Sequence, residues 1–257
     1  MIDVPTVFFT GIAGSGKTYL TKAFYEWMED EGYSAGIINL DPGVEQLPYV
    51  PDVDVREWIT LESVMEQYGL GPNGAQIVCA DMIALNSKRI LMEVEENLRG
   101  VDYVLIDTPG QIELFAFRSA SRFLIDSLTE KPMLCFLLDG SMCRTPSGFV
   151  SQILLSLSTQ LRLQVPTVNV LSKADLLDEL TIRNIKTWCN DIYTLKDAIE
   201  FEGVVFSELS KAIVDTLFEV GAILEVFPIS ALKREGMEDI YSAVQSVYSA
   251  GEDISKS

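Results

Sequence analysis

The sequence predicts an α/β fold in which a mostly parallel sheet is covered by helices on both faces. Short apolar, β-branched runs alternate with helical patterns, a glycine-rich loop joins the first run to the first helical pattern, and later polar motifs directly follow such runs. Parallel α/β sheets bind ligands at the carboxyl ends of their strands, which is where these motifs fall. With 257 residues and 48% hydrophobic content, the chain is long enough to bury a large core.

The first strand and the loop after it carry a phosphate-binding pattern. Residues 4–10 form a short apolar run, and residues 11–18, GIAGSGKT, match the P-loop pattern G-x-x-x-x-G-K-[ST]. Apolar side chains at helical spacing follow over residues 20–28, and Gly32 supplies a stop. A plain glycine-rich turn is the alternative, but the strand before the loop and the helix after it favour a P-loop NTPase.

Each residue type in this loop has a physical role. Glycines let backbone N–H groups turn toward a phosphate, and the helix N-terminus adds its positive dipole end. Lys17 is expected to reach the outer phosphates, and the Thr18 hydroxyl to hold Mg²⁺. The residues expected to contact the nucleotide here are Ala13, Gly14, Ser15, Gly16, Lys17, Thr18 and Tyr19.

Further strands are expected at residues 35–40, 103–106, 133–138, 167–171 and 225–229. Two of the connections between these strands are longer than a β-α-β crossover requires. The sequence therefore predicts one domain over residues 1–257, with a helical insertion at about 41–100 and another at about 181–224. The apolar stretch 203–224 is long enough to raise the question of a membrane span. Charged residues interrupt it at helical spacing, which favours an amphipathic helix; they are Glu208, Lys211, Asp215 and Glu219.

Composition excludes several classes of function. The 38 acidic and 19 basic residues give a net charge of -19, which repels a phosphate backbone, so direct nucleic-acid binding is not expected. The chain has no histidine, which excludes Ser-His-Asp catalysis, histidine-ligated zinc and a histidine general base. Carboxylates, lysine, amides and a bound metal must therefore carry the chemistry.

Cysteine usage and the N-terminus indicate a cytoplasmic protein without a membrane partner. The four cysteines have no metal-binding spacing and are expected to be reduced thiols. The first residues lack the basic region of a signal peptide.

A second motif follows the strand expected at 103–106. The sequence Asp107-Thr108-Pro109-Gly110-Gln111 contains D-x-x-G, in which Asp107 is expected to hold the Mg²⁺ shell and the Gly110 amide to sense the terminal phosphate. A strand followed by an aspartate and a turn is a weak signal alone, but it becomes strong beside a P-loop.

Two further motifs point to guanine. Residues 172–175, SKAD, lie close to the N-K-x-D element of GTPases: the Asp175 carboxylate would pair with the guanine N1–H and amino group, and the Lys173 stem would cover the base. Ser172 stands where the usual element has asparagine, so one side-chain bridge to the P-loop or the base is expected to be weaker. An ordinary helix N-cap formed by Ser172 or Asp175 is the alternative. A later S-A-L turn would place backbone groups at guanine O6; it consists of Ser230, Ala231 and Leu232.

Three segments together resemble the GPN-loop GTPases, and the short chain looks like the archaeal type. They are residues 39–49 (NLDPGVEQLPY), 51–56 (PDVDVR) and 71–74 (GPNG). Without the family, Gly71-Pro72-Asn73-Gly74 is simply a β-turn with proline at i+1.

The resemblance implies a homodimer in which the loop of Gly71, Pro72 and Asn73 enters the partner's active site. Asn73 would there donate to the γ-phosphate position, as an arginine finger does in other GTPases. Asp41 and Gln111 match residues that orient the attacking water, and Glu113 lies where it could assist. Asp41 has two alternative roles, a contact to the Mg²⁺ shell or the start of a turn. Arg56 resembles a residue of a switch region. The alternative interpretation is that Arg56 forms a surface ion pair.

The predicted function is a Mg²⁺-dependent GTP hydrolase that acts as a homodimeric switch. The resemblance further implies a role in assembling a protein complex such as RNA polymerase, with that polymerase or an assembly factor as partner. One alternative is a nucleotide-gated, client-binding chaperone with slow hydrolysis, in which the helix expected within 203–224 presents a groove. A P-loop kinase or a MinD-like ATPase is the other.

Overall fold

Seven strands form one sheet over the residues that the computed structural model describes, 1–203, 207–221 and 225–248. They are β1 (Thr6–Gly11), β2 (Ala35–Asn39), β3 (Val53–Asp54), β4 (Tyr103–Asp107), β5 (Pro132–Asp139), β6 (Thr167–Ser172) and β7 (Val226–Pro228). Their order is β3-β2-β4-β1-β5-β6-β7, and every neighbouring pair is parallel. All the carboxyl ends therefore lie at one edge of the sheet, as the sequence predicts.

Side chains of the central strand β1 alternate between two cores because successive residues of a strand point to opposite faces. Phe8 is fully buried in one core. Val7 and Phe9 are fully buried in the other. A strand buried on both faces is continuously apolar, which explains why residues 4–10 show no polar alternation.

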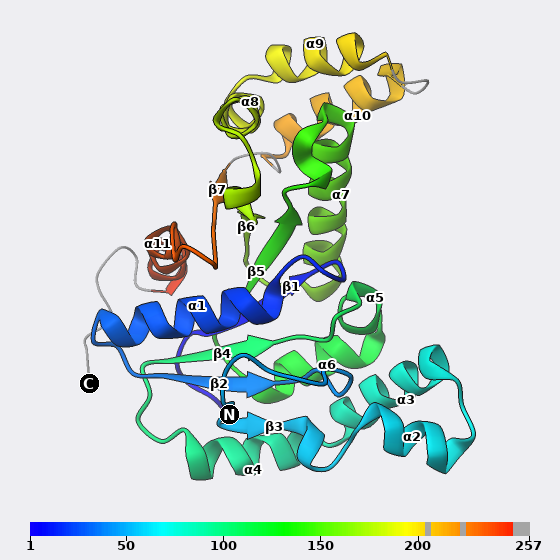
Figure 1. Cartoon of the computed structure of the whole chain (residues 1–257), viewed down its shortest axis with the longest axis vertical. Helices are drawn as coiled ribbons and strands as arrows, with labels where there is room; N and C mark the ends of the chain where they lie inside the picture. The colour runs from blue at the N-terminus through cyan, green and yellow to red at the C-terminus, as the bar shows by residue number, and fades with distance from the viewer. Residues whose placement is uncertain (204–206, 222–224, 249–257) are drawn as a thin grey trace.

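Helices cover both faces. On one face lie α1 (Lys17–Asp30) and α11 (Met237–Tyr248), whose buried side chains include Phe24 and Ile240. The other face packs against α4 (Ser87–Asn97), α5 (Ile112–Phe115), α6 (Ser119–Leu128) and α7 (Pro146–Leu163). This two-sided cover is visible in Figure 1 and confirms the predicted fold class.

Two groups of helices extend beyond these layers (Figure 1). The first consists of α2 (Leu61–Tyr68) and α3 (Pro72–Leu85), which follow β3. The second lies at the far end of the molecule and consists of α8 (Glu179–Asn190), α9 (Ile192–Glu202) and α10 (Ser207–Glu219). Three short 3₁₀ helices complete the described chain: η1 (Val55–Glu57), η2 (Met142–Arg144) and η3 (Ala174–Leu176).

The structure corrects two sequence predictions between β2 and β4. Strand β3 was not predicted, because two residues are too few to show a periodicity. The β-turn at residues 71–74 was wrong: Gly71 caps helix α3, and Pro72 occupies its first turn. Proline sets a backbone angle that suits the first helical position, and the apolar residues after it continue the helix.

The stretch 203–224 does not form one helix. Gly203 ends α9 with a left-handed backbone, φ 67°, and α10 begins only at Ser207. Residues 204–206 and 222–224 lie outside the described chain. Helix α10 is amphipathic as predicted, with Val214 and Leu217 buried. None of the helices described is both long and apolar enough to cross a membrane.

Two glycines offer a matched test of the packing beneath the S-A-L turn. Gly236 has φ +80°, and an added Cβ would lie 2.6 Å from the Pro228 carbonyl oxygen; Gly69 has φ +62° and open space around it. We expect Gly69→Ala to lower the free energy of unfolding by about 1–2 kcal/mol, from left-handed strain alone. Gly236→Ala should lower it further, because the backbone must also shift. Urea unfolding of both variants measures this, and equal losses would contradict the packing.

Candidate functional site

The P-loop joins the carboxyl end of β1 to helix α1 through two glycines in the left-handed region. Gly14 has φ 76°, and Gly16, the N-cap of α1, has φ 99°. Residues that carry a side chain rarely adopt these backbone angles, which explains why both positions are glycine. The loop thus brings the N-terminal amides of α1 to the end of the central strand, where they can accept an anion.

Lys17 is buried, with 5% of its surface exposed. Its ammonium donates to the carbonyl oxygens of Gly11 (3.0 Å), Ile12 (3.1 Å) and Gly110 (2.8 Å). Burial lowers the pKa of Lys17, while the charges of nearby Asp107 and Asp41 oppose that shift. The contact with Gly110 connects the P-loop directly to the D-x-x-G loop after β4.

Asp107 ends β4 in a fully buried position. Its Oδ2 accepts a hydrogen bond of 2.8 Å from the Tyr49 hydroxyl, and its Oδ1 is buried without a hydrogen-bond partner. Burial raises the pKa of Asp107 to about 6, although the Tyr49 and Thr18 hydroxyls favour the charged form. A carboxylate oxygen without a partner beside a threonine hydroxyl is the donor chemistry that Mg²⁺ prefers, so these residues fit that ion.

Asp41 holds the same D-x-x-G loop from the other side. Its Oδ2 accepts from the Gly110 N–H at 2.9 Å, and its Oδ1 accepts from the Gly43 N–H at 2.9 Å. Burial is the main cause of its raised pKa, which the two backbone hydrogen bonds oppose. Asp41 therefore starts the turn at Gly43. It also accepts the hydrogen bond of the Gly110 amide, which was predicted to sense the terminal phosphate.

A cavity of about 250 Å³ opens beside this pair of residues. Gln111 lines it, and Gln76 of α3 contributes an amide oxygen that is buried without a hydrogen-bond partner. Glu113 is exposed and does not line the cavity. Asn73 is also exposed, on the first turn of α3, and does not line it in its own chain.

Arg56 fastens the segment after β2 rather than forming a plain surface ion pair. Its guanidinium contacts the Asp54 carboxylate at 2.6 Å and donates to the Val44 carbonyl oxygen at 3.0 Å. Asn39 donates to the same Asp54 carboxylate at 2.9 Å. The segment around Asp41 is thereby tied to strands β2 and β3.

A second cavity, of about 180 Å³, lies on the opposite side of the P-loop. Helix α1 and the loops after β6 and β7 surround it. The residues lining it are Ser15, Gly16, Tyr19, Leu20, Ser172, Lys173, Asp175, Ile229, Ala231 and Leu232. All the residues predicted to contact the base line this cavity except Ser230. Its hydroxyl is hydrogen-bonded to Asp175, which does line it.

Hydrogen bonds fix the polar groups of this second cavity. The Ser230 hydroxyl donates to the Asp175 carboxylate at 2.7 Å, and the Lys173 ammonium contacts the Asp139 carboxylate at 2.8 Å. Ser172, at the position of the usual asparagine, donates to the Leu138 carbonyl oxygen at 3.0 Å. Neither Ser172 nor Asp175 caps a helix: Asp178 caps α8, so the N-cap alternative was wrong.

Three residues that contact or line the site were not predicted from the sequence: Tyr49, Asp139 and Gln76. Asp139 directly follows an apolar run, so the rule that found Asp107 could have found it. Tyr49 lies 58 residues from its partner Asp107, and no local pattern indicates such a contact. Gln76 lies on α3, of which only the first residues, 72–74, were interpreted, as part of a turn.

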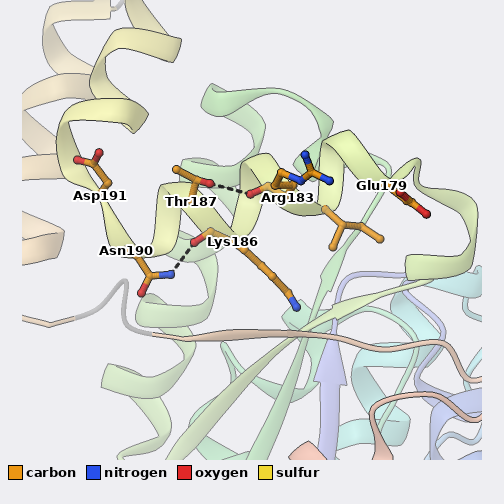
Figure 2. Close-up of a pocket in the computed structure, with 7 residues that line it drawn as sticks. Glu179, Arg183, Lys186, Thr187, Asn190 and Asp191 are labelled. Atoms are coloured by element: carbon orange, nitrogen blue, oxygen red, sulfur yellow. Dashed lines mark hydrogen bonds between the residues drawn. The ribbon is translucent and has the colours of Figure 1, made fainter.

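A larger hollow of about 520 Å³ lies along α8, away from both cavities (Figure 2). Its polar side chains include Thr187 and Asn190, which donate to the carbonyl oxygens of Arg183 and Lys186 in their own helix. None of the motifs predicted to bind the nucleotide lines this hollow.

The two cavities flank one loop at the end of the central strand, which is the arrangement of the P-loop nucleoside triphosphatases. A family model described as "Conserved hypothetical ATP binding protein" matches residues 9–250. A GPN-loop GTPase of Pyrococcus abyssi is 34% identical over 96% of this chain and 99% of its own length. GPN-loop GTPase 1 of Dictyostelium discoideum is 28% identical over 91% of this chain, which spans 59% of that relative.

A solved structure agrees with the sequence matches. The apo form of a GTPase from Pyrococcus abyssi superimposes with a TM-score of 0.85, covering 95% of this chain and 97% of that one. The chain belongs to the GPN-loop GTPase family. The predicted resemblance is therefore confirmed, as is the prediction of a GTPase at the level of the family.

Asp139 provides a test of the base cavity. Although burial pushes its pKa upward, the hydrogen bond from Lys173 brings that pKa below its ordinary value. We expect Asp139→Asn to weaken GTP binding about 10-fold, because the ammonium beside the base loses a charged partner. Asp215→Asn, which breaks a partly buried pair with Lys196 on helices outside the base cavity, is the control and should change affinity less than about twofold. Fluorescent nucleotide titration distinguishes the two, and equal effects would contradict this role of Asp139.

Proposed function

We propose that this chain is a Mg²⁺-dependent GTP hydrolase that works as a homodimeric nucleotide switch. One observation carries the proposal: both backbone polar groups of Gly110 are hydrogen-bonded, its carbonyl oxygen to Lys17 and its N–H to Asp41. A γ-phosphate beside the P-loop competes for both groups, since it offers oxygens to the ammonium and to the amide. Binding of the triphosphate is therefore coupled to movement of the D-x-x-G loop.

The choice of guanine rests on the second cavity. The Asp175 carboxylate, oriented by Ser230, has acceptor capacity left for the two adjacent donors of guanine. Adenine offers no such pair of donors and would leave the carboxylate unsatisfied. Lys173 is held by Asp139 at the edge of the same cavity, where its stem would cover the base.

The metal would be held by Thr18 and Asp107. When bound, the ion supplies electrostatic stabilisation of charge on the phosphate oxygens. The chain itself supplies the remaining positive charge through Lys17, whose three carbonyl partners are weaker than phosphate oxygens would be.

Hydrolysis requires a water oriented at the γ-phosphate. Once the γ-phosphate takes the Gly110 amide, Asp41 is released from that hydrogen bond and faces the cavity that Gln111 also lines. We assign water positioning to Asp41 and Gln111. Glu113, which is exposed and outside the cavity, takes at most an indirect part.

The last donor comes from the partner chain in this proposal. Asn73 is exposed at the start of α3 beside Gly71 and Pro72, and it is absent from the cavity of its own chain. An exposed amide on a helical N-terminus is accessible to a second active site, where it would stabilise developing phosphate charge.

For the cellular role, we propose assembly of a protein complex such as RNA polymerase, in the cytoplasm. The support is family resemblance together with the net charge of -19, which suits a basic partner. The chaperone alternative relied on an apolar helix within 203–224, but Val214 and Leu217 of α10 are buried in the core. The ATPase or kinase alternative agrees with the description of the family model, and nucleotide preference decides between them.

Nucleotide preference gives the first test of this function. We expect GTP to bind at least about tenfold more tightly than ATP, since an unpaired carboxylate against adenine costs on the order of 1–3 kcal/mol. Asp175→Asn should weaken GTP and relax the preference for guanine. Calorimetric titration with GTP, ATP and inosine triphosphate measures both effects. Equal affinities for GTP and ATP in the wild type would favour the ATPase alternative.

The shared active site gives the second test. Asn73→Ala should reduce turnover about 10- to 1,000-fold, as expected for loss of a donor to developing charge, while GDP affinity stays unchanged. Lys17→Ala should abolish turnover by removing the phosphate contact. Asn184→Ala, at an exposed asparagine on α8, is the control and should keep the wild-type rate.

Mixing the two inactive variants makes the test specific for a site built from two chains. A heterodimer pairs the intact P-loop of one chain with the intact Asn73 of the other, so an equal, fully exchanged mixture should recover about a quarter of wild-type turnover. Native mass spectrometry confirms subunit exchange. A mixture with no more activity than its two components would reject the shared site.

A further inference from the structure

Tyr49 connects the segment after β2 to the end of β4. Its hydroxyl donates to Asp107 Oδ2 at 2.8 Å, across 58 residues of sequence, and leaves Oδ1 buried without a hydrogen-bond partner. The two oxygens of one carboxylate thus differ: the protein holds the first, and the second is available to a ligand.

The tyrosine is itself fixed by its surroundings. Its ring packs, partly buried, against the core between the sheet and helix α1, whereas its neighbour Val50 is 90% exposed. The segment is fastened on either side of Tyr49, by Arg56 at the Val44 carbonyl and by Asp52, whose carboxylate accepts from the Ile37 N–H at 2.8 Å. Tyr49 is the point between these anchors at which the segment reaches the nucleotide site.

We propose that Tyr49 is a positioning residue for the metal site: its hydroxyl holds Asp107 so that Oδ1 faces the Mg²⁺ shell. The inference rests on the proposed Mg²⁺-dependent function. A carboxylate that binds metal, directly or through water, is oriented by the hydrogen bonds of its other oxygen, and loss of such a partner typically costs 10- to 100-fold in metal affinity. Because Tyr49 belongs to the segment that carries Asp41, it also connects the metal site to the segment that holds the Gly110 amide.

The test separates metal affinity from nucleotide affinity. Tyr49→Phe keeps the ring and removes only the hydroxyl. The Kd for Mn²⁺ on GDP-loaded protein, followed by electron paramagnetic resonance, should rise about 10- to 100-fold. GDP affinity measured in EDTA should change less than about twofold, because the hydrogen bond acts on the metal ligand and not on the phosphates.

Two further variants serve as controls. Tyr248→Phe removes another partly buried hydroxyl, which donates to the Pro132 carbonyl oxygen on α11's side of the sheet, and should leave the Mn²⁺ Kd unchanged. Asp107→Asn removes the carboxylate itself and should abolish the dependence of GDP binding on Mn²⁺.

Each outcome decides the question. A wild-type Mn²⁺ Kd in Tyr49→Phe would overturn the positioning role. So would an equal loss of GDP affinity in EDTA, or a fall in thermal stability well beyond that of Tyr248→Phe, because these indicate a purely structural hydroxyl. If wild-type protein bound GDP with no dependence on metal, the proposed function itself would fail, and this result is read from the wild type alone.

Discussion

The buried ammonium of Lys17 is the constraint on which the phosphate half of this structure depends. A charge with so little exposure is costly unless acceptors surround it, and three backbone carbonyl groups from two loops provide them. One of those carbonyls belongs to Gly110, so the loop after β4 must approach the loop after β1 closely. The N–H of the same residue, Gly110, donates to Asp41, which follows β2. Three loops that are distant in sequence are thus held in contact by a single charge and its partners.

The order of the strands distributes the chemistry across the sheet. Strands β2, β4 and β1, which lead to Asp41, Asp107 and the P-loop, are direct neighbours, so the residues proposed to act on the phosphates lie on one side of the sheet. On the other side, β5, β6 and β7 end near Asp139, Lys173 and the S-A-L turn, at the cavity proposed to hold the base. A nucleotide bound across the strand ends would join the two halves. Its base would lie at the ends of β5, β6 and β7, the strands connected by α7 to α10. The parallel arrangement is essential here, because an antiparallel strand would carry its loop to the opposite edge.

Much of this site could be predicted because each motif directly follows a buried strand. Lys17, Asp107 and Asp175 were found in this way, and the guanine motifs gained support from their order along the chain. The prediction failed where structure depends on distant contacts or on very short elements. Strand β3 exists only because residues 53 and 54 pair with β2, which no local periodicity shows. Pro72 fits both a turn and the first turn of a helix, so the sequence between Gly71 and Leu85 allowed both interpretations. The contacts of Tyr49 and Asp139 require the strand order, which becomes evident only in the folded chain.

The burial of all four cysteines has a practical consequence for observing the proposed nucleotide cycle. Cys79, Cys135, Cys143 and Cys189 are buried free thiols, and burial raises the pKa values of Cys143 and Cys189 to about 12. Thiolates are the species that maleimide dyes attack, so these side chains react slowly at neutral pH. A single cysteine introduced at an exposed position such as Gln46, on the segment that carries Tyr49, would then accept a fluorophore selectively. The native thiols need no prior replacement, which makes the chain suitable for single-molecule fluorescence of the nucleotide cycle.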